Sequence, residues 1–233
     1  MGSAHAQLVH MVSADGRASS WALAQLAGTP NASSELRASV GPQLLPVAPS
    51  CAAFAGAHES DSFFVGCESG SVYLTSRSAS DSDLNQQPHL EAHRGPVRRL
   101  AVASPPPGSS SGAVLASVGA DWAVRVWDAG KARSLSLPSL GCAGASISWG
   151  RPGILFAGDA RGRLHTWDLS RGARVSSVTE ISSSPLSALT VHHGLLLAGD
   201  AAGVVHVYRP HESLLVGDEH QKGFEAVLDA VAN

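Results

Sequence analysis

Five segments of the chain end in a similar short phrase, and this repetition constrains the fold more than any other feature. In each phrase a turn is followed by a strand of alternating character, and most of the phrases end in an aromatic residue. They lie at 15–21 (DGRASSW), 69–75 (SGSVYLT), 121–127 (DWAVRVW), 161–167 (RGRLHTW) and 202–208 (AGVVHVY). Such repetition predicts an array of similar strand units.

The spacing of the phrases indicates the kind of array. Their last residues are separated by 54, 52, 40 and 41 residues, and the last two intervals match the period of roughly 40–45 residues of a WD40 blade. Insertions rich in Ser, Pro, Gly and Asn explain the longer intervals, and we expect irregular connections at 28–50 and 77–88. A four-stranded blade cannot bury its faces alone, so blades must stack around an axis. The sequence predicts an all-β fold, an incomplete WD40 β-propeller of about five blades.

The strand pattern also suggests boundaries. We expect the partial propeller to occupy 1–213, with repeats ending near residues 26, 76, 128, 169 and 209. The chain begins in mid-blade, so an open arc is expected rather than a closed ring, with unpaired strand edges at both ends. Within 214–233, Phe224, Val227, Leu228 and Val231 have helical spacing, which predicts a short C-terminal helix.

Composition and motifs argue against several classes of function. A net charge of −3 does not suit a general nucleic-acid binder. No apolar run reaches the roughly 18–20 residues of a membrane span. Three cysteines at scattered spacings form neither a disulfide framework nor a zinc motif. The sequence contains no phosphate-binding loop and no His-Glu-x-x-His motif. We therefore expect no enzyme, cofactor, metal, nucleic acid or membrane partner.

One repeat carries four polar residues in the pattern of a complete WD40 blade: His93, Ser117, Asp121 and Trp127. In that pattern the residues form a hydrogen-bond chain that ties the strands of a blade together. In a low-dielectric interior such a network stabilises the fold when every polar group in it has a hydrogen-bond partner. We interpret this set as structural and buried, and not as a catalytic Ser-His-Asp arrangement.

The order of several less common phrases resembles the C-terminal part of dynein intermediate chains, with the cytoplasmic type most similar. These phrases lie at 12–23, 64–77, 92–97, 121–127, 155–169 and 198–208. The most specific is 121–127, since a Trp directly after the turn Asp is uncommon in WD40 repeats but resembles the family's "FDWTVKLW". The chain departs from the family pattern near Cys142, where the usual His before the first strand is missing. The resemblance includes neither the family's N-terminal region, which binds light chains and dynactin, nor two blades of an expected seven.

The resemblance implies a non-catalytic scaffold subunit of a dynein motor complex, which acts in microtubule-based movement in the cytoplasm at the cytoskeleton. It implies docking on the tail of the dynein heavy chain and contact with other dynein subunits on the cargo side. The alternatives are a generic WD40 interaction platform in another complex and a ciliary, intraflagellar or axonemal, intermediate chain. Candidate partner-binding residues are Arg94, Trp122 and Arg161, from turns expected on one propeller face. The alternative role for Trp122 is a plug between blades, and for the arginines it is simple solvation.

Overall fold

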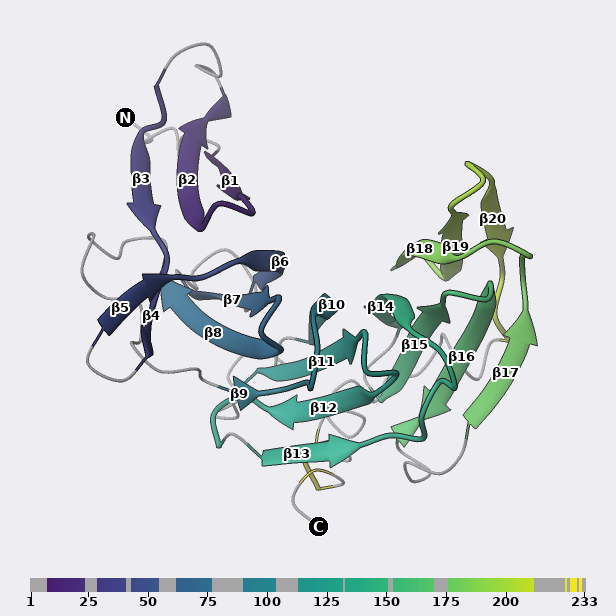
Figure 1. Ribbon diagram of the computed structural model, residues 1–233. Helices are drawn as coiled ribbons and strands as arrows, with labels where there is room; N and C mark the ends of the chain where they lie inside the picture. Colours follow the sequence, from purple (N-terminus) through teal and green to yellow (C-terminus); the bar gives the residue numbers. More distant parts are fainter. Residues whose placement is uncertain are drawn as a thin grey trace, which may run out of the picture.

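The computed structural model describes residues 8–23, 29–40, 43–54, 62–76, 90–103, 113–131, 133–150, 153–169, 176–211, 225, 227–229 and 231. These residues form short antiparallel strands gathered into successive sheets that follow one another along an arc (Figure 1). The first sheet contains β1 (Leu8–Val12), β2 (Arg17–Ala22) and β3 (Ala32–Glu35). A separate hairpin of β4 (Arg37–Val40) and β5 (Gln43–Pro46) follows it.

Three four-stranded sheets form the middle of the arc. The second sheet contains β6 (Pro49–Phe54), β7 (Ser62–Cys67), β8 (Ser71–Ser76) and β9 (Leu90–Glu91). The third contains β10 (Val97–Ala103), β11 (Val114–Gly119), β12 (Val124–Asp128) and β13 (Arg133–Ser136). The fourth contains β14 (Gly144–Trp149), β15 (Ile154–Asp159), β16 (Arg163–Asp168) and β17 (Ser176–Glu180). The fifth has β18 (Leu186–His192), β19 (Leu195–Asp200) and β20 (Val205–Tyr208).

The strands β6, β10, β14 and β18 are the innermost strands of their sheets. Each contacts the inner strand of the neighbouring sheet, and they line the concave side of the arc (Figure 1). All four have a register shift within their first three residues, at Pro49/Cys51, Val97/Arg99, Gly144/Ser146 and Leu186/Ala188. The shared irregularity shows that the sheets are repeats of one unit, although their sequences differ.

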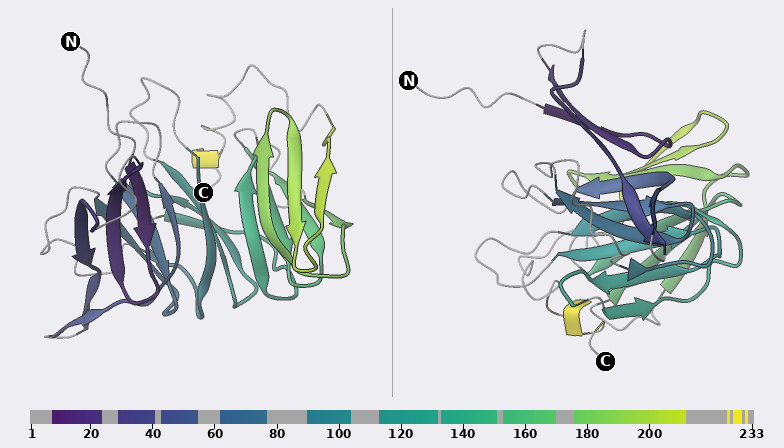
Figure 2. Two further views of the ribbon diagram at one scale, coloured as in Figure 1. Left: turned by 90° about the horizontal axis from the view of Figure 1, so that it is seen from above. Right: turned by 60° about the vertical axis from the view of Figure 1, so that its left-hand side comes forward.

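The two end sheets are incomplete in different ways. In the first sheet β1 and β2 flank the turn at Gly16, as β7 and β8 flank Gly70, so β1 corresponds to the second strand of a blade. In the fifth sheet β20 corresponds to the third strand, and the described residues add no fourth. Figure 1 shows these sheets at opposite ends of an open arc, and Figure 2 shows the strands from the side. The predicted fold class, an incomplete all-β propeller with five blades or part-blades, is confirmed.

The predicted irregular connection at 28–50 is wrong. This segment contains β3, the hairpin β4–β5 and the first residues of β6. These strands are held by backbone pairing, and within the described residues the β4–β5 hairpin forms a two-stranded sheet of its own. Their residues carry little alternation of apolar and polar side chains, which is the signal that identifies a half-buried strand. The second predicted connection, 77–88, lies outside the described residues.

The core lies between successive sheets. The largest apolar cluster joins β11 and β12 of the third sheet to β14, β15 and β16 of the fourth, with Val118, Leu155 and Trp167 among its members. Near the C-terminus Val227 and Val231 are helical, and both are buried in this same cluster. Phe224 and much of the predicted tail at 214–233 fall outside the described residues. Among the described residues, no helix has the length and apolar character needed to span a membrane.

Candidate partner-binding face

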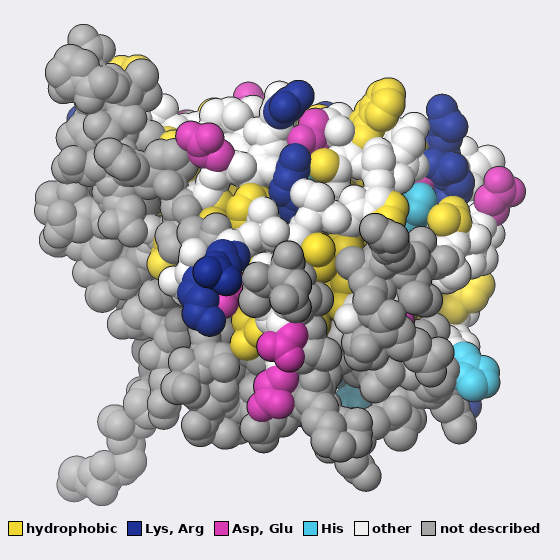
Figure 3. All heavy atoms as spheres, turned by 90° about the horizontal axis from the view of Figure 1, so that it is seen from below, with side chains coloured by type: hydrophobic (Ala, Val, Ile, Leu, Met, Phe, Trp, Pro, Cys, Tyr) yellow, Lys and Arg dark blue, Asp and Glu magenta, His cyan; other side chains and the backbone are white. Residues whose placement is uncertain are grey.

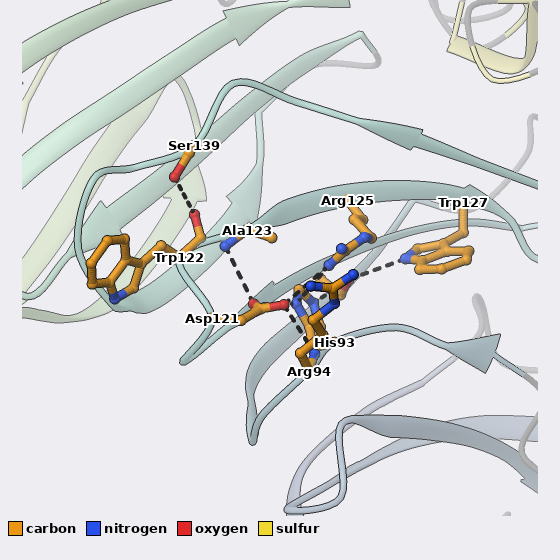
Figure 4. Close-up of polar contacts among 9 residues, drawn as sticks. His93, Arg94, Asp121, Trp122, Ala123, Arg125, Trp127 and Ser139 are labelled. Atoms are coloured by element: carbon orange, nitrogen blue, oxygen red, sulfur yellow. Dashed lines mark hydrogen bonds and ion pairs between the residues drawn. The ribbon is translucent and has the colours of Figure 1, made fainter.

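Hydrogen bonds join His93, Ser117, Asp121 and Trp127 at the third sheet. His93, Asp121 and Trp127 are labelled in Figure 4. His93 precedes β10, and its Nδ1 lies 2.8 Å from Oδ1 of Asp121 in the β11–β12 turn. Its Nε2 lies 2.9 Å from Oγ of Ser117, which also accepts a hydrogen bond of 3.1 Å from Nε1 of Trp127. His93, Ser117 and Trp127 are buried, whereas the Asp121 side chain is 14% exposed. The chain of bonds therefore runs from the core to the surface of the turn.

Asp121 is the centre of this network because it also binds the backbone. Its carboxylate accepts hydrogen bonds from the N–H groups of Arg94 at 3.0 Å and Ala123 at 3.3 Å, and Arg125 Nη1 lies 3.4 Å away. Burial disfavours its ionised form, but the Arg94 N–H and the His93 ring outweigh that effect and lower the pKa of Asp121. Burial also lowers the pKa of His93 despite the nearby carboxylate. At neutral pH a neutral imidazole therefore faces an ionised carboxylate.

Related carboxylate networks occur in the next two sheets. Asp159 Oδ2 binds Arg163 Nε at 2.7 Å and His165 Nε2 at 2.9 Å. Asp200 Oδ2 binds Ser182 Oγ at 2.7 Å and His206 Nε2 at 3.0 Å. Sequence reasoning missed these two networks. The signal was a His two residues before the terminal aromatic residue in the fourth and fifth phrases.

Arg163 explains how the fourth sheet is fixed without the usual His before its first strand. While its Nε binds Asp159, its Nη2 donates a 2.8 Å hydrogen bond to the carbonyl of Leu140 and lies 3.7 Å from Sγ of Cys142. One guanidinium thus joins the β15–β16 turn to the connection that enters the sheet. These networks hold the turns rigidly against the incoming segments.

Trp122 has an unusual backbone conformation in the β11–β12 turn. Its φ is 68°, in the left-handed region, and the residue is 52% exposed. The corresponding residues of the other sheets are all glycines with positive φ: Gly16, Gly70, Gly162 and Gly203. The carbonyl of Trp122 accepts hydrogen bonds from Leu140 N at 3.1 Å and Ser139 Oγ at 3.2 Å, which fix the turn. In Figure 4 the indole ring points away from the His93–Asp121 network.

The backbone N–H groups of the two candidate arginines each donate to the carboxylate of a turn Asp. The N–H of Arg94 donates to Asp121, and the N–H of Arg161 donates to Asp159 at 2.8 Å. Both residues are exposed. No hydrogen bond joins the side chains of Arg94, Trp122 and Arg161 in the described part of the chain. The arrangement therefore offers two exposed cations and one indole from turns of the third and fourth sheets and from the connection into β10.

The described residues contain no group of three or more His, Cys, Asp or Glu placed to hold a metal ion. All three cysteines are free thiols, and burial raises the pKa of Cys51 to about 11 and that of Cys67 to about 12. The thiols of Cys51 and Cys67 are therefore protonated at neutral pH. On the face seen in Figure 3, the basic and acidic side chains of the described residues are interspersed.

Comparison with known proteins finds relatives by sequence and similar solved structures. No protein-family model matches the chain. The chain is 28% identical over 221 residues to the cytoplasmic dynein 1 intermediate chain of Drosophila melanogaster. The alignment covers 92% of this chain but only 32% of that relative.

Two solved structures of computationally designed proteins resemble the fold. The Ika8 protein superposes with a TM-score of 0.60 at 19% identity, covering 87% of this chain and 55% of its own. The Ika4 protein gives a TM-score of 0.52 at 20% identity, covering 70% of this chain and 91% of its own. At such identities the matches support the fold alone. The similarity to the Drosophila protein confirms the resemblance to the dynein intermediate chain family that the turn phrases predicted.

Proposed function

We propose that this protein is a non-catalytic scaffold subunit of a dynein motor complex. In this role it docks on the tail of the dynein heavy chain and links it to other dynein subunits on the cargo side, in the cytoplasm at the cytoskeleton. The observation that carries the proposal is the similarity to a cytoplasmic dynein 1 intermediate chain over 92% of this chain. The chain spans about a third of that relative, so the proposal concerns the propeller part of such a subunit.

The chemistry of the turns supports binding rather than catalysis. The carboxylates of Asp121, Asp159 and Asp200 are engaged by His, Ser or Arg side chains and by backbone N–H groups. Both nitrogens of the His93 ring are engaged as well. These groups therefore hold the turns in place, and a rigid frame that presents turns suits partner recognition.

We propose that the face carrying Arg94, Trp122 and Arg161 contacts the heavy chain. Trp and Arg are the residues that most often dominate the energy of a protein interface. Trp122 remains exposed in a backbone conformation that costs a non-glycine residue roughly 1–2 kcal/mol. Within the protein Trp122 is still 52% exposed, and a partner that covers it would bury the rest of the ring.

Affinity purification from cells that express the tagged chain tests the assignment. We expect the wild type to recover a dynein heavy chain, and the class of heavy chain recovered separates the cytoplasmic role from the intraflagellar and axonemal ones. The variant Trp122→Ala/Arg161→Ala should recover much less. Arg133→Ala, on the outer strand β13, is the matched control and should bind as the wild type does. Recovery of an unrelated complex without any heavy chain would favour the general WD40 platform.

A further inference from the structure

The connection from β17 to β18 contains three consecutive serines followed by a proline, at 182–185. It enters the fifth sheet as the segment 93–96 enters the third. In both segments the proline carbonyl accepts a 2.9 Å hydrogen bond from an alanine N–H in the turn between the second and third strands of the sheet. By this correspondence Ser183 takes the position of Arg94. The serines therefore lie on the candidate partner-binding face.

Ser182 has a structural role in this connection. Its Oγ donates a 2.7 Å hydrogen bond to Oδ2 of Asp200 and accepts one of 3.0 Å from the N–H of Ser184. Its own backbone N–H donates to the carbonyl of Gly162 at 3.1 Å. Ser182 stands in the position of His93 and, like His93, ties the incoming segment to the turn Asp. Its hydroxyl is therefore already engaged.

The next two serines are not engaged in this way. Within the described residues the hydroxyls of Ser183 and Ser184 make no hydrogen bond, and neither backbone is bonded to another element. Ser183 is exposed and Ser184 is half-buried. Of the three serines only Ser184 is followed by proline, and Ser-Pro is the dipeptide that proline-directed protein kinases recognise. A residue before proline also favours the extended backbone, which is the conformation in which kinases bind their substrates.

An exposed cation lies beside this connection. A Cβ on Gly162 would lie 1.9 Å from the carbonyl oxygen of Ser182 and 2.7 Å from that of Ser184, so the β15–β16 turn packs directly against the serines. Arg161 immediately precedes Gly162 and is exposed, and its guanidinium makes no hydrogen bond in the described part of the chain. The other arginine of this turn, Arg163, is held by Asp159 and Leu140. Arg161 is therefore the cation that a new anion on the serines would meet.

We propose that Ser184 is a phosphorylation site and that its phosphate binds Arg161. A proline-directed protein kinase transfers the γ-phosphoryl group of a nucleoside triphosphate to Ser184 Oγ. The new O–P bond forms as the bond between the γ-phosphorus and the β–γ bridging oxygen breaks, the nucleoside diphosphate leaves, and the hydroxyl proton is released. A phosphoserine carries a charge of about −1.5 to −2 at pH 7 and three strong acceptor oxygens. These oxygens match the planar donor fork of a guanidinium.

Phosphorylation would also change the candidate partner-binding face. It would engage Arg161, one of the two exposed arginines of that face, and add negative charge beside it. Docking of the heavy-chain tail should therefore weaken. This consequence rests on the proposed function, whereas the modification and its contact with Arg161 do not.

Mass spectrometry of the full chain after incubation with a proline-directed kinase and ATP tests the site. We expect phosphate on Ser184 in the wild type and in Ser183→Ala, and none on this segment in Ser184→Ala. Pro185→Ala should also abolish the modification, with folding checked by circular dichroism. If the kinase modified a peptide of residues 179–190 but left Ser184 of the folded chain unmodified, the proposal would be overturned.

Titration of the phosphorylated chain by ³¹P NMR tests the contact with Arg161. The second pKa of a phosphoserine lies near about 6, and a bound guanidinium favours the dianion and lowers that pKa. We expect a lower pKa in the wild type than in the phosphorylated 179–190 peptide. Arg161→Gln should return it to the peptide value, whereas Arg94→Gln, the matched control, should leave it lowered. A phosphate pKa that Arg161→Gln does not change would show that Arg161 is not its partner.

Binding to a purified dynein heavy-chain tail tests the consequence for docking. The phosphorylated chain should bind at least about fivefold more weakly than the unmodified chain, as expected for the loss of an interface arginine. Equal affinities of the two forms would reject the regulatory effect and leave the proposed function standing. Absence of binding by the unmodified chain would instead contradict the proposed function, while the mass spectrum and the titration still decide whether Ser184 is modified and whether its phosphate binds Arg161.

Discussion

Trp122 stands at the turn position that Gly162 occupies in the next sheet, and both residues have a positive φ, 68° and 80°. A Cβ on Gly162 would lie 1.9 Å from the carbonyl oxygen of Ser182, so that turn accepts only glycine. The connection that follows Trp122 also hydrogen-bonds to the turn carbonyl, through Leu140 N and Ser139 Oγ, but it leaves the Trp122 side chain exposed. The third sheet thus tolerates a side chain where its neighbour cannot.

This comparison predicts that Trp122→Gly is more stable than Trp122→Ala by about 1 kcal/mol, because glycine adopts a left-handed conformation without the Cβ penalty. Urea denaturation measures the difference in the free energy of unfolding. Gly203→Ala is the matched control. Gly203 has a φ of 87° and open space around it, so the substitution should cost a similar amount through backbone strain alone. Equal stabilities of the Gly and Ala variants at position 122 would show that the turn is not strained.

The Trp167 indole provides a second prediction. Its Nε1 is buried, and it has no hydrogen-bond partner among the described residues. The corresponding Trp127 donates to Ser117, whose place in the fourth sheet is taken by Ala157. Ala157→Ser should supply the missing acceptor and raise the free energy of unfolding by about 1 kcal/mol.

Ala198→Ser is the matched control for this change. Ala198 is equally buried at the same strand position, but the third strand of the fifth sheet ends in Tyr208, which has no indole N–H. The added hydroxyl should therefore destabilise that sheet. Thermal denaturation compares the two variants. An equal loss of stability in both would contradict the conclusion that Trp167 Nε1 lacks a hydrogen-bond partner.

The Asp121 network predicts a specific loss on truncation. Asp121→Ala leaves His93 Nδ1 and the N–H of Arg94 without their acceptor, which should cost about 1–3 kcal/mol. Asp15 occupies the same turn position in the first sheet but is exposed, and Asp15→Ala should change the free energy of unfolding far less. Chemical denaturation of both variants tests this. A free energy of unfolding unchanged by Asp121→Ala would reject the structural role of the set.

The pKa of His93 gives a pH dependence with a definite sign. Because burial lowers its pKa in the folded state, the unfolded chain binds a proton near the ordinary value of 6.5 that folded His93 does not. Stability should therefore fall as the pH decreases below about 6.5. Between about pH 7.5 and about pH 5.5 the free energy of unfolding of His93→Gln should decrease less than that of the wild type. If the free energy of unfolding fell equally with pH in the wild type and in His93→Gln, His93 would contribute nothing to the pH dependence. At lower pH a further loss follows, since the lowered pKa of Asp121 stabilises the fold only while the carboxylate is ionised.

The repeating turn phrases were sufficient to predict the propeller, because each phrase specifies a turn and a strand that recur in register. They did not predict the strands at 32–46. Those strands depend on backbone pairing at the margins of the sheets, and a Pro and a Gly-Pro pair interrupt the pattern there. Sequence periodicity reports buried faces, so it is weak where few side chains are buried.

The candidate face was only partly predictable. Arg94, Trp122 and Arg161 were identified from their turns, but the left-handed backbone of Trp122 depends on the path of the following connection. The role of Arg163 was also hidden, because its partners Leu140 and Cys142 are more than 20 residues away in sequence. Such contacts between a turn and an incoming segment are set by the stacking of sheets, which no local pattern encodes.

The affinity of the purified chain for a purified dynein heavy-chain tail tests the central claim most directly. We expect specific binding by the wild type and by Arg133→Ala. The folded variant Trp122→Ala/Arg161→Ala should bind about thirtyfold more weakly, which corresponds to about 2 kcal/mol of interface energy. Unchanged affinity of the double variant would reject this face as the docking surface. The absence of binding by the folded wild type would contradict the role in a dynein complex.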